Sequence, residues 1–196
     1  RGTRMQVKIV LFGNSESGKT SLITRYVDKN FSRRPQKTIG GNFYHKKINI
    51  GPTAMNFQLW DVETATNPIL GPSFYRETHA AVLVIDSTQP FNHNEIQTQI
   101  NQIKQLAPDA KIYIAVNKCD DRDSPIHKDF QLNDFKNDPT GQVDQVGVTK
   151  KLKTATQGLI SLQDKNIFFC SAKDDKNVHQ LFYAIGENHV EAHQVK

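Results

Sequence analysis

The chain has 196 residues, of which 37% are hydrophobic and 23% are charged, and its formal net charge is +5. This composition predicts one globular domain of ordinary size and excludes a disordered chain. No apolar run approaches the ~20 residues of a membrane-spanning helix, and the basic residues are too scattered to indicate a nucleic-acid partner. Cys119 and Cys170 each lie beside a strand-like run, so we expect buried thiols in a reducing cytosol rather than a disulfide.

A glycine-rich stretch at residues 13–20 reads GNSESGKT, which matches the phosphate-loop pattern G-x-x-x-x-G-K-[ST]. An apolar run at residues 7–12 precedes it and predicts a buried strand. Apolar residues then recur at roughly helical spacing over residues 21–27. Strand, loop and helix in this order are the context that a phosphate loop requires, so an ordinary turn before a helix is the weaker interpretation.

The residue types in this loop suit a phosphorylated nucleotide. Gly13 and Gly18 allow a turn whose N–H groups point inward at phosphate oxygens. The Lys19 ammonium is expected to reach the β- and γ-phosphates, and the Thr20 hydroxyl is expected to ligate Mg²⁺. The predicted nucleotide contacts of this stretch are Ser15, Glu16, Ser17, Gly18, Lys19, Thr20 and Ser21.

Strand and helix patterns alternate along the rest of the chain. Apolar and polar residues alternate at 42–50 and 54–61, around a Gly-Pro-Thr turn, which predicts a β-hairpin. Further strands are predicted at residues 80–86, 111–116 and 166–170, and helices at residues 94–106 and 177–190. This order predicts an α/β fold with a mostly parallel sheet of about six strands and helices on both faces.

Two short motifs follow predicted strands at the carboxyl edge of this sheet, where ligands bind. They are Asn117-Lys118-Cys119-Asp120 and Ser171-Ala172-Lys173. The Asp120 carboxylate is suited to accept hydrogen bonds from the N1–H and the amino group of guanine, a pair that adenine lacks. A backbone N–H near Ala172 would donate to guanine O6, and the stem of Lys118 would lie across the ring. The motifs therefore favour a guanine nucleotide, with an ATP-dependent phosphotransferase as the less favoured alternative.

With these motifs the chain resembles the Ras-like small GTPases, and within them the Rab family, from about residue 6 to about residue 188. Thr38-Ile39-Gly40 is similar to the Rab switch I motif, and residues 86–88 and 74–76 are similar to the family's D-x-T and Y-Y-R segments. The resemblance implies the P-loop fold of small GTPases and a molecular switch in vesicle trafficking that binds GTP or GDP with Mg²⁺. It also implies a cytoplasmic protein, peripheral on the cytosolic face of intracellular membranes, with effectors, a GEF and a GAP as partners.

The resemblance also assigns roles to single residues. Thr38 would ligate Mg²⁺ together with Thr20, with Asp61 in an outer-shell role at the metal, and Thr38 and Lys19 would be the catalytic contacts to the γ-phosphate. Phe31 would pack edge-on against guanine. The implied contacts of the base motifs are Asn117, Lys118, Asp120, Ser171, Ala172 and Lys173. The implied effector surface consists of Phe43, Trp60 and Phe74. Packing within the domain is an equally good interpretation of these aromatic residues.

The segment after the hairpin reads WDVETAT from residue 60, where the family has W-D-T-A-G-Q-E. Asp61 is retained, so an outer-shell role toward Mg²⁺ is expected. Thr64 stands where the family has the Gly whose N–H senses the γ-phosphate, and Ala65 where it has the Gln that orients the attacking water. We therefore expect slow GTP hydrolysis and a switch II that couples weakly to the nucleotide. A non-hydrolysing binding module that docks Rab-type partners is the alternative.

Glu16 and the region between the two base motifs are further departures from the family. A small residue is usual at the position of Glu16, where a carboxylate that points inward would repel phosphate. A carboxylate that points to solvent would have little effect, and this is the preferred interpretation. Residues 121–146 are an expected insertion, loop-like with a short helix near residues 128–135. This insertion could form a partner-binding surface or an ordered loop without a function of its own, and the sequence does not choose between the two.

The expected domain spans residues 5–190. We expect residues 1–4 to be a terminal remnant and residues 191–196 to be a C-terminal tail. The chain ends without the prenylated cysteines that Rab proteins carry, which implies a trimmed end or another route to the membrane. His189 and His193 lie one helical turn apart, and a solvated helix face is preferred over zinc ligation.

Overall fold

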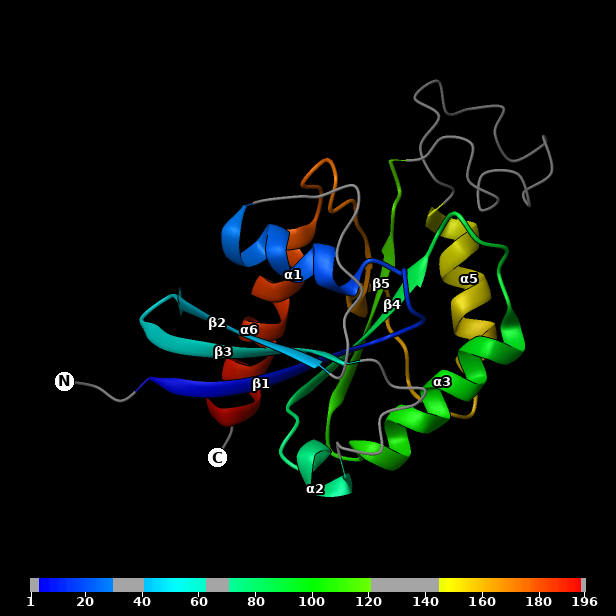
Figure 1. The fold of residues 1–196 in the computed structure, drawn as a ribbon. Coiled ribbons are helices and arrows are strands. Elements are labelled where there is room, and N and C mark those ends of the chain that lie inside the picture. Colours follow the sequence, from blue (N-terminus) through cyan, green and yellow to red (C-terminus); the bar gives the residue numbers. More distant parts are fainter. Residues whose placement is uncertain (1–3, 30–40, 63–70, 121–144, 195–196) are drawn as a thin grey trace.

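The computed structural model describes residues 4–29, 41–62, 71–120 and 145–194 (Figure 1). Six strands form one sheet in the order β2-β3-β1-β4-β5-β6. The strands are β1 (Met5–Phe12), β2 (Gly41–Ile50), β3 (Thr53–Val62), β4 (Ala80–Asp86), β5 (Lys111–Asn117) and β6 (Ile167–Phe169). β2 and β3 form the antiparallel hairpin, and the other neighbouring strands are parallel. The predicted, mostly parallel sheet is confirmed.

Helices cover both faces of the sheet. They are α1 (Lys19–Asp28), α2 (Pro72–Tyr75), α3 (His93–Leu106), α5 (Gln145–Thr156) and α6 (Val178–Gln194), with a 3₁₀ turn, η1, at Asp164–Asn166. α1 and α6 lie on one face of the sheet, and α3 and α5 lie on the other (Figure 1). The α/β architecture that the alternating pattern predicts is therefore confirmed.

The central strand β1 serves both hydrophobic cores. Val7, Ile9 and Leu11 point into the core under α1 and α6, whereas Val10 and Phe12 point into the core under α3 and α5. Successive side chains of a strand face opposite sides of the sheet, so a strand that is buried on both faces needs a continuous apolar run. Because β1 lies between β3 and β4 in the sheet, the loop that follows it begins near the middle of the carboxyl edge.

Several element boundaries differ from the predicted ones. α5 begins at Gln145, so the last two residues of the expected insertion are helical, and α6 continues to Gln194, past the expected end of the domain. α5 escaped prediction because its many polar residues obscure the apolar face, although Val148 and Leu152 pack in the core. The helix expected at residues 128–135 lies outside the described residues.

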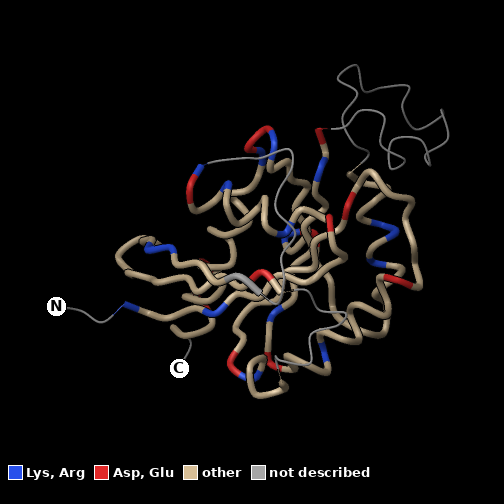
Figure 2. Tube along the Cα trace, viewed as in Figure 1, with Lys and Arg blue, Asp and Glu red and all other residues tan. Residues whose placement is uncertain are grey.

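Lys and Arg are spread over several strands and helices, with Asp and Glu among them (Figure 2). This distribution matches the scattered charges of the sequence. Among the residues that the structure describes, every helix is too short or too polar to cross a bilayer.

Candidate nucleotide-binding site

The loop between β1 and α1 takes a path that requires glycine at two positions. Gly13 has a φ of 142° and Gly18 a φ of 98°, values that residues with a Cβ rarely adopt. A Cβ on Gly13 would lie 2.4 Å from the carbonyl oxygen of Val84, and one on Gly18 would lie 2.2 Å from Nδ2 of Asn117. The two glycines of the phosphate-loop motif therefore let the loop pass close to β4 and β5.

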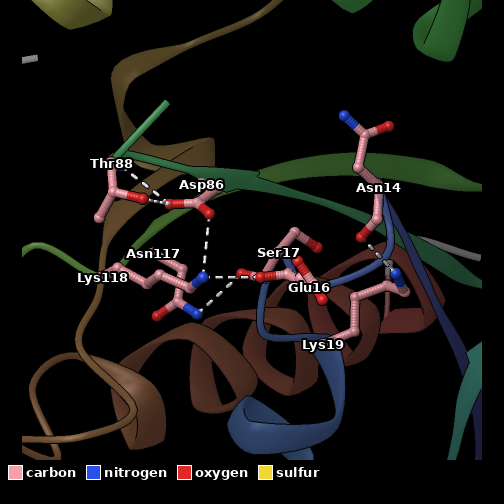
Figure 3. A network of polar contacts seen from close by, with 8 residues as sticks. All are labelled: Asn14, Glu16, Ser17, Lys19, Asp86, Thr88, Asn117 and Lys118. Carbon is pink, nitrogen blue, oxygen red and sulfur yellow. Dashed lines mark hydrogen bonds and ion pairs between the residues drawn. The ribbon is translucent and has the colours of Figure 1, made fainter. Parts of the chain in front are cut away.

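Lys19, the first residue of α1, is folded back against the loop (Figure 3). The residue is 6% exposed. Its ammonium donates hydrogen bonds to the carbonyl oxygens of Gly13 at 2.9 Å and of Asn14 at 2.8 Å. A phosphate that approaches the N–H groups of this loop and the N-terminus of α1 would meet this cation.

Thr20 and Asp61, two of the three residues expected at the Mg²⁺ site, meet at the carboxyl edge of the sheet. The Thr20 hydroxyl on α1 donates a hydrogen bond to Oδ2 of Asp61 in β3. Because Leu11 of β1 pairs with Asp61, the carboxylate lies next to the phosphate loop. A hydroxyl and a carboxylate are oxygen donors that fit Mg²⁺. The described part of the chain places no three His, Cys, Asp or Glu side chains around a metal position, so the remaining ligands would include phosphate and water.

Asn117 joins the phosphate loop to the loop after β6. Its side chain is buried, with 1% exposure. Its Nδ2 donates to the carbonyl oxygen of Ser17 at 3.1 Å (Figure 3), and its Oδ1 accepts from the backbone N–H of Ala172 at 3.4 Å. These partners lie 100 and 55 positions away from Asn117 in the chain. The fold thus brings the predicted phosphate and base motifs into one site.

The Asp120 carboxylate is oriented by the loop after β6. Ser171 Oγ donates to Asp120 Oδ1 at 2.7 Å and accepts from the backbone N–H of Asp174 at 3.0 Å. Nζ of Lys173 lies 3.9 Å from Asp120 Oδ2. Ser171 and Lys173 therefore help to fix the position of this carboxylate.

Lys118 connects the base motif to the phosphate loop through its ammonium. Nζ lies 2.9 Å from Oδ2 of Asp86 and donates to the backbone carbonyl oxygen of Glu16 at 2.7 Å (Figure 3). Asp86 Oδ1 in turn accepts from the backbone N–H and from Oγ1 of Thr88 at 2.8 and 2.6 Å. The sequence identified the D-x-T segment only by resemblance, and the contact with Lys118 gives Asp86 a physical role.

Glu16 has a φ of 71°, in the left-handed region, and is exposed. Its backbone carbonyl accepts the hydrogen bond from Lys118, while its side chain is open to solvent. This placement supports the outward interpretation of the carboxylate. Its effect on nucleotide affinity stays a prediction.

Three contacts of the site were not evident from any motif. Arg25 of α1 donates from Nε to the carbonyl oxygen of Ala172 at 2.7 Å. Asn14 contacts Glu95 of α3, and its Oδ1 accepts from Nε2 of Gln99 at 3.1 Å. These partners lie 147, 81 and 85 positions apart in the chain, so local spacing does not reveal them.

Some of the expected functional residues lie outside the described residues. They are Phe31, Thr38, Thr64 and Ala65. Most of the expected insertion, residues 121–144, also lies outside. The roles of these residues stay predictions.

The expected effector residues form one aromatic stack across β2, β3 and α2. The ring centroids of Phe43 and Trp60 are 4.4 Å apart, and those of Trp60 and Phe74 are 4.8 Å apart. Phe43 remains 40% exposed. The stack is compatible both with packing within the domain and with an effector surface, because its rings pack on one another and still present apolar surface to solvent.

Cys119 and Cys170 are free thiols. Burial raises the pKa of the Cys119 thiol to about 12, and burial also raises the pKa of Cys170. The expectation of free thiols is confirmed, but only Cys170 is fully buried, and Cys119 is partly buried.

Comparisons with known proteins agree with this geometry. Residues 8–191 match the model of the Ras family. The GTP-binding protein YPT53 of Saccharomyces cerevisiae is 27% identical over 186 residues, which cover 93% of this chain and 76% of that protein. Ras-related protein Rab-24 of Dictyostelium discoideum is 28% identical over 187 residues, or 95% of this chain and 82% of that protein. Ras-related protein Rab-21 of Mus musculus is 32% identical over 121 residues, or 61% of this chain and 54% of that protein.

Proposed function

Because this chain belongs to the Ras family and is a Rab-like small GTPase, we propose that it binds GTP and GDP with Mg²⁺ and hydrolyses GTP slowly. The observation that carries the proposal is the pair of hydrogen bonds made by the Asn117 side chain. They join the phosphate loop at Ser17 to the loop after β6 at Ala172. A ligand with phosphates at one end and a base at the other would contact both loops.

At the phosphate end, Lys19 and the N–H groups of the loop hold the β- and γ-phosphates. Thr20 and Thr38 would ligate Mg²⁺, with Asp61 in an outer-shell role, and the bound ion would neutralise charge on the phosphates. Lys19 and Thr38 are the catalytic contacts to the γ-phosphate. The contact between Thr20 and Asp61 supports this assignment.

At the base end, the Asp120 carboxylate accepts from the N1–H and the amino group of guanine. The backbone N–H of Ala172 donates to O6, and the stem of Lys118 lies across the ring. Phe31 packs against the edge of the base. The contacts of Ser171 and Lys173 with Asp120 support this assignment, because they fix the carboxylate before the base arrives.

Slow hydrolysis follows from the residues after β3. The methyl group of Ala65 cannot orient a water molecule for in-line attack, and Thr64 restricts the backbone that would sense the γ-phosphate. A partner that supplies an orienting group in trans would restore the rate. The switch therefore depends on its partners for turnover more than a typical Rab protein does.

As a Rab-like switch, the domain at residues 5–190 acts in vesicle trafficking with effectors, a GEF and a GAP as its kinds of partner. Effectors contact the aromatic stack of Phe43, Trp60 and Phe74. The protein is cytoplasmic and peripheral on the cytosolic face of intracellular membranes.

A second candidate function is a non-hydrolysing module that docks Rab-type partners. Thr64 and Ala65 favour it. The rings of the aromatic stack also contact one another directly, so this docking surface needs no nucleotide to hold its shape. Lys19 and Thr20 argue against a complete loss of nucleotide binding.

The nucleotide that the purified protein retains, identified by chromatography after denaturation, tests both candidates. Retained GTP supports the slow switch, retained GDP indicates turnover, and a protein without nucleotide supports the docking module. A single-turnover GTP assay beside a Rab protein known to hydrolyse then measures the rate. Equal rates would contradict slow hydrolysis. Ala65→Gln should raise the rate by about tenfold, since it restores the orienting amide.

A further inference from the structure

Arg25 joins the helix that begins at the phosphate loop to the loop that follows β6. Its Nε donates to the carbonyl oxygen of Ala172 at 2.7 Å, and its Nη2 donates to the carbonyl oxygen of Lys173 at 3.0 Å. Its Nη1 donates to the carbonyl oxygen of Lys29 at 3.0 Å, just past the end of α1. One half-buried guanidinium therefore holds three backbone carbonyls.

Ala172 is held on both sides as a result. Its N–H donates to Oδ1 of Asn117, and its carbonyl oxygen accepts from Arg25. Fixing the donor and the acceptor of one residue restricts both of its backbone dihedral angles. The direction of the Ala172 N–H is thus set jointly by a residue of the base motif and by a residue of α1.

The rest of this loop is closed on itself and on Asp120. Ser171 and Lys176 exchange two backbone hydrogen bonds, at 3.1 and 2.9 Å, and Ser171 Oγ donates to Asp120. These contacts anchor the residue before Ala172 and the residue that closes the turn. The carbonyls of Ala172 and Lys173 point out of this turn toward α1, where Arg25 meets them.

We propose that Arg25 is a positioning residue for guanine recognition, because it holds the backbone of Ala172, whose N–H donates to Asn117 Oδ1 at 3.4 Å and would be offered to O6 when the base binds. The inference rests on the proposed function, in which the ligand is a guanine nucleotide. Arginine suits this role because its planar guanidinium offers several N–H donors in a fixed fork, and its charge strengthens each bond to a carbonyl. Lysine at this position would keep the charge but lose the fork.

The test compares GDP with two analogues that differ from it at one group each. In 6-thio-GDP a sulfur, which is a weak acceptor, replaces O6 and leaves the N1–H and the amino group in place. IDP keeps O6 and the N1–H but lacks the amino group that Asp120 binds. The ratio of GDP affinity to 6-thio-GDP affinity therefore reports the Ala172 contact, and the ratio to IDP affinity reports the Asp120 contact.

For Arg25→Met we expect GDP release to become about tenfold faster. We also expect the preference for GDP over 6-thio-GDP to fall about fivefold, while the preference over IDP changes less than about twofold. Arg25→Lys should fall between wild type and Arg25→Met. Lys104→Met is the matched control, because Lys104 also donates to a backbone carbonyl, that of Leu159 at 2.7 Å, but it does so on α3. Its two preferences should equal those of wild type.

A merely structural role would weaken GDP and both analogues by the same factor, and unchanged preferences in Arg25→Met and Arg25→Lys would overturn the proposal. If Arg25→Met does not fold, Arg25→Lys alone decides by the same ratios. Wild-type protein that does not prefer GDP over ADP would overturn the guanine assignment as well. If wild type prefers GDP over ADP but the Arg25 variants keep the wild-type preferences, only the positioning role of Arg25 is contradicted.

Discussion

Polar side chains gather at both ends of the parallel strands, but the two ends are organised differently. At the carboxyl end, the side chains of Asn117 and Lys118 reach backbone groups of other loops and connect them. At the amino end, His79 precedes β4 and its Nδ1 accepts from the backbone N–H of Lys8 at 2.8 Å. The ring of His189 on α6 lies 4.9 Å from the ring of His79.

The difference lies in what the polar groups connect. The carboxyl end joins loops whose backbone N–H groups can turn toward a ligand, whereas the amino end packs neutral rings between a strand and a helix. Burial is the main cause that lowers the pKa of His79 and lowers the pKa of His189 to about 4. His79 lies beside His189, but among the described residues no three His, Cys, Asp or Glu side chains are placed so that they could hold zinc. Connections between loops, rather than the number of polar residues, therefore mark the ligand site.

The largest expected effect comes from Asp120→Asn, which changes the groups offered to the base. An amide offers one donor and one acceptor, which match the C2 carbonyl and the N1–H of xanthine instead of the two donors of guanine. We expect the ratio of GDP affinity to XDP affinity to fall about a thousandfold, measured by competition with a fluorescent nucleotide. Asp109→Asn, an exposed change near the amino end, should leave the ratio as it is. A ratio that Asp120→Asn does not change would remove Asp120 from base recognition.

The second prediction compares two glycine-to-alanine substitutions. It separates the cost of a positive φ from the cost of a steric overlap between a Cβ in the phosphate loop and Asn117. Gly18 and Gly158 both have positive φ, but a Cβ on Gly18 would overlap Asn117, whereas a Cβ on Gly158 would meet nothing within 4 Å. We expect Gly18→Ala to lower the free energy of unfolding by about 3 kcal/mol and Gly158→Ala by about 1 kcal/mol. Urea denaturation measures both. Equal losses would mean that the packing of the loop against β5 contributes little.

The difference between local sequence patterns and contacts made by residues far apart in the chain explains how much of the molecule was predictable. The apolar run of β1, the glycine-rich phosphate loop and the start of α1 follow from local residue types. This strand, turn and helix were therefore predicted correctly. Asp120 was identified as a candidate because a short motif follows an apolar strand. Arg25 was not, and Asp86 was identified only by resemblance, because their contacts are with residues that only the folded chain brings close. α5 was missed because its apolar face is too narrow to dominate its pattern.

A third prediction concerns the amino end and its pH dependence. The ordinary pKa of histidine, 6.5, describes the unfolded chain, and the folded value for His189 is lower, about 4. The unfolded state therefore binds more protons in this range, so stability is present above pH 6.5 and is lost as the pH falls toward 4. After a discount for solvent screening at a half-buried ring, we expect a loss of about 1 kcal/mol.

The measurement is urea denaturation between pH 7 and pH 4.5, with GDP and Mg²⁺ held constant. His189→Gln should make the pH dependence shallower than in wild type. His93→Gln, at an exposed position of α3, is the control and should leave the slope unchanged. The same slope in all three proteins would show that burial at the amino end does not hold His189 neutral.

The smallest expected effect is at Glu16, where the phosphate loop holds a residue other than glycine at a φ of 71°. Glu16→Gly removes the left-handed strain but also makes the unfolded chain more flexible, so we expect a net gain of about 0.5 kcal/mol in the free energy of unfolding. Because the carboxylate is exposed and screened, GDP release should equal that of wild type within about twofold. Stopped-flow release of a fluorescent GDP measures the second quantity. Release that is several times slower in Glu16→Gly would show that the carboxylate points at the phosphates once the nucleotide is bound.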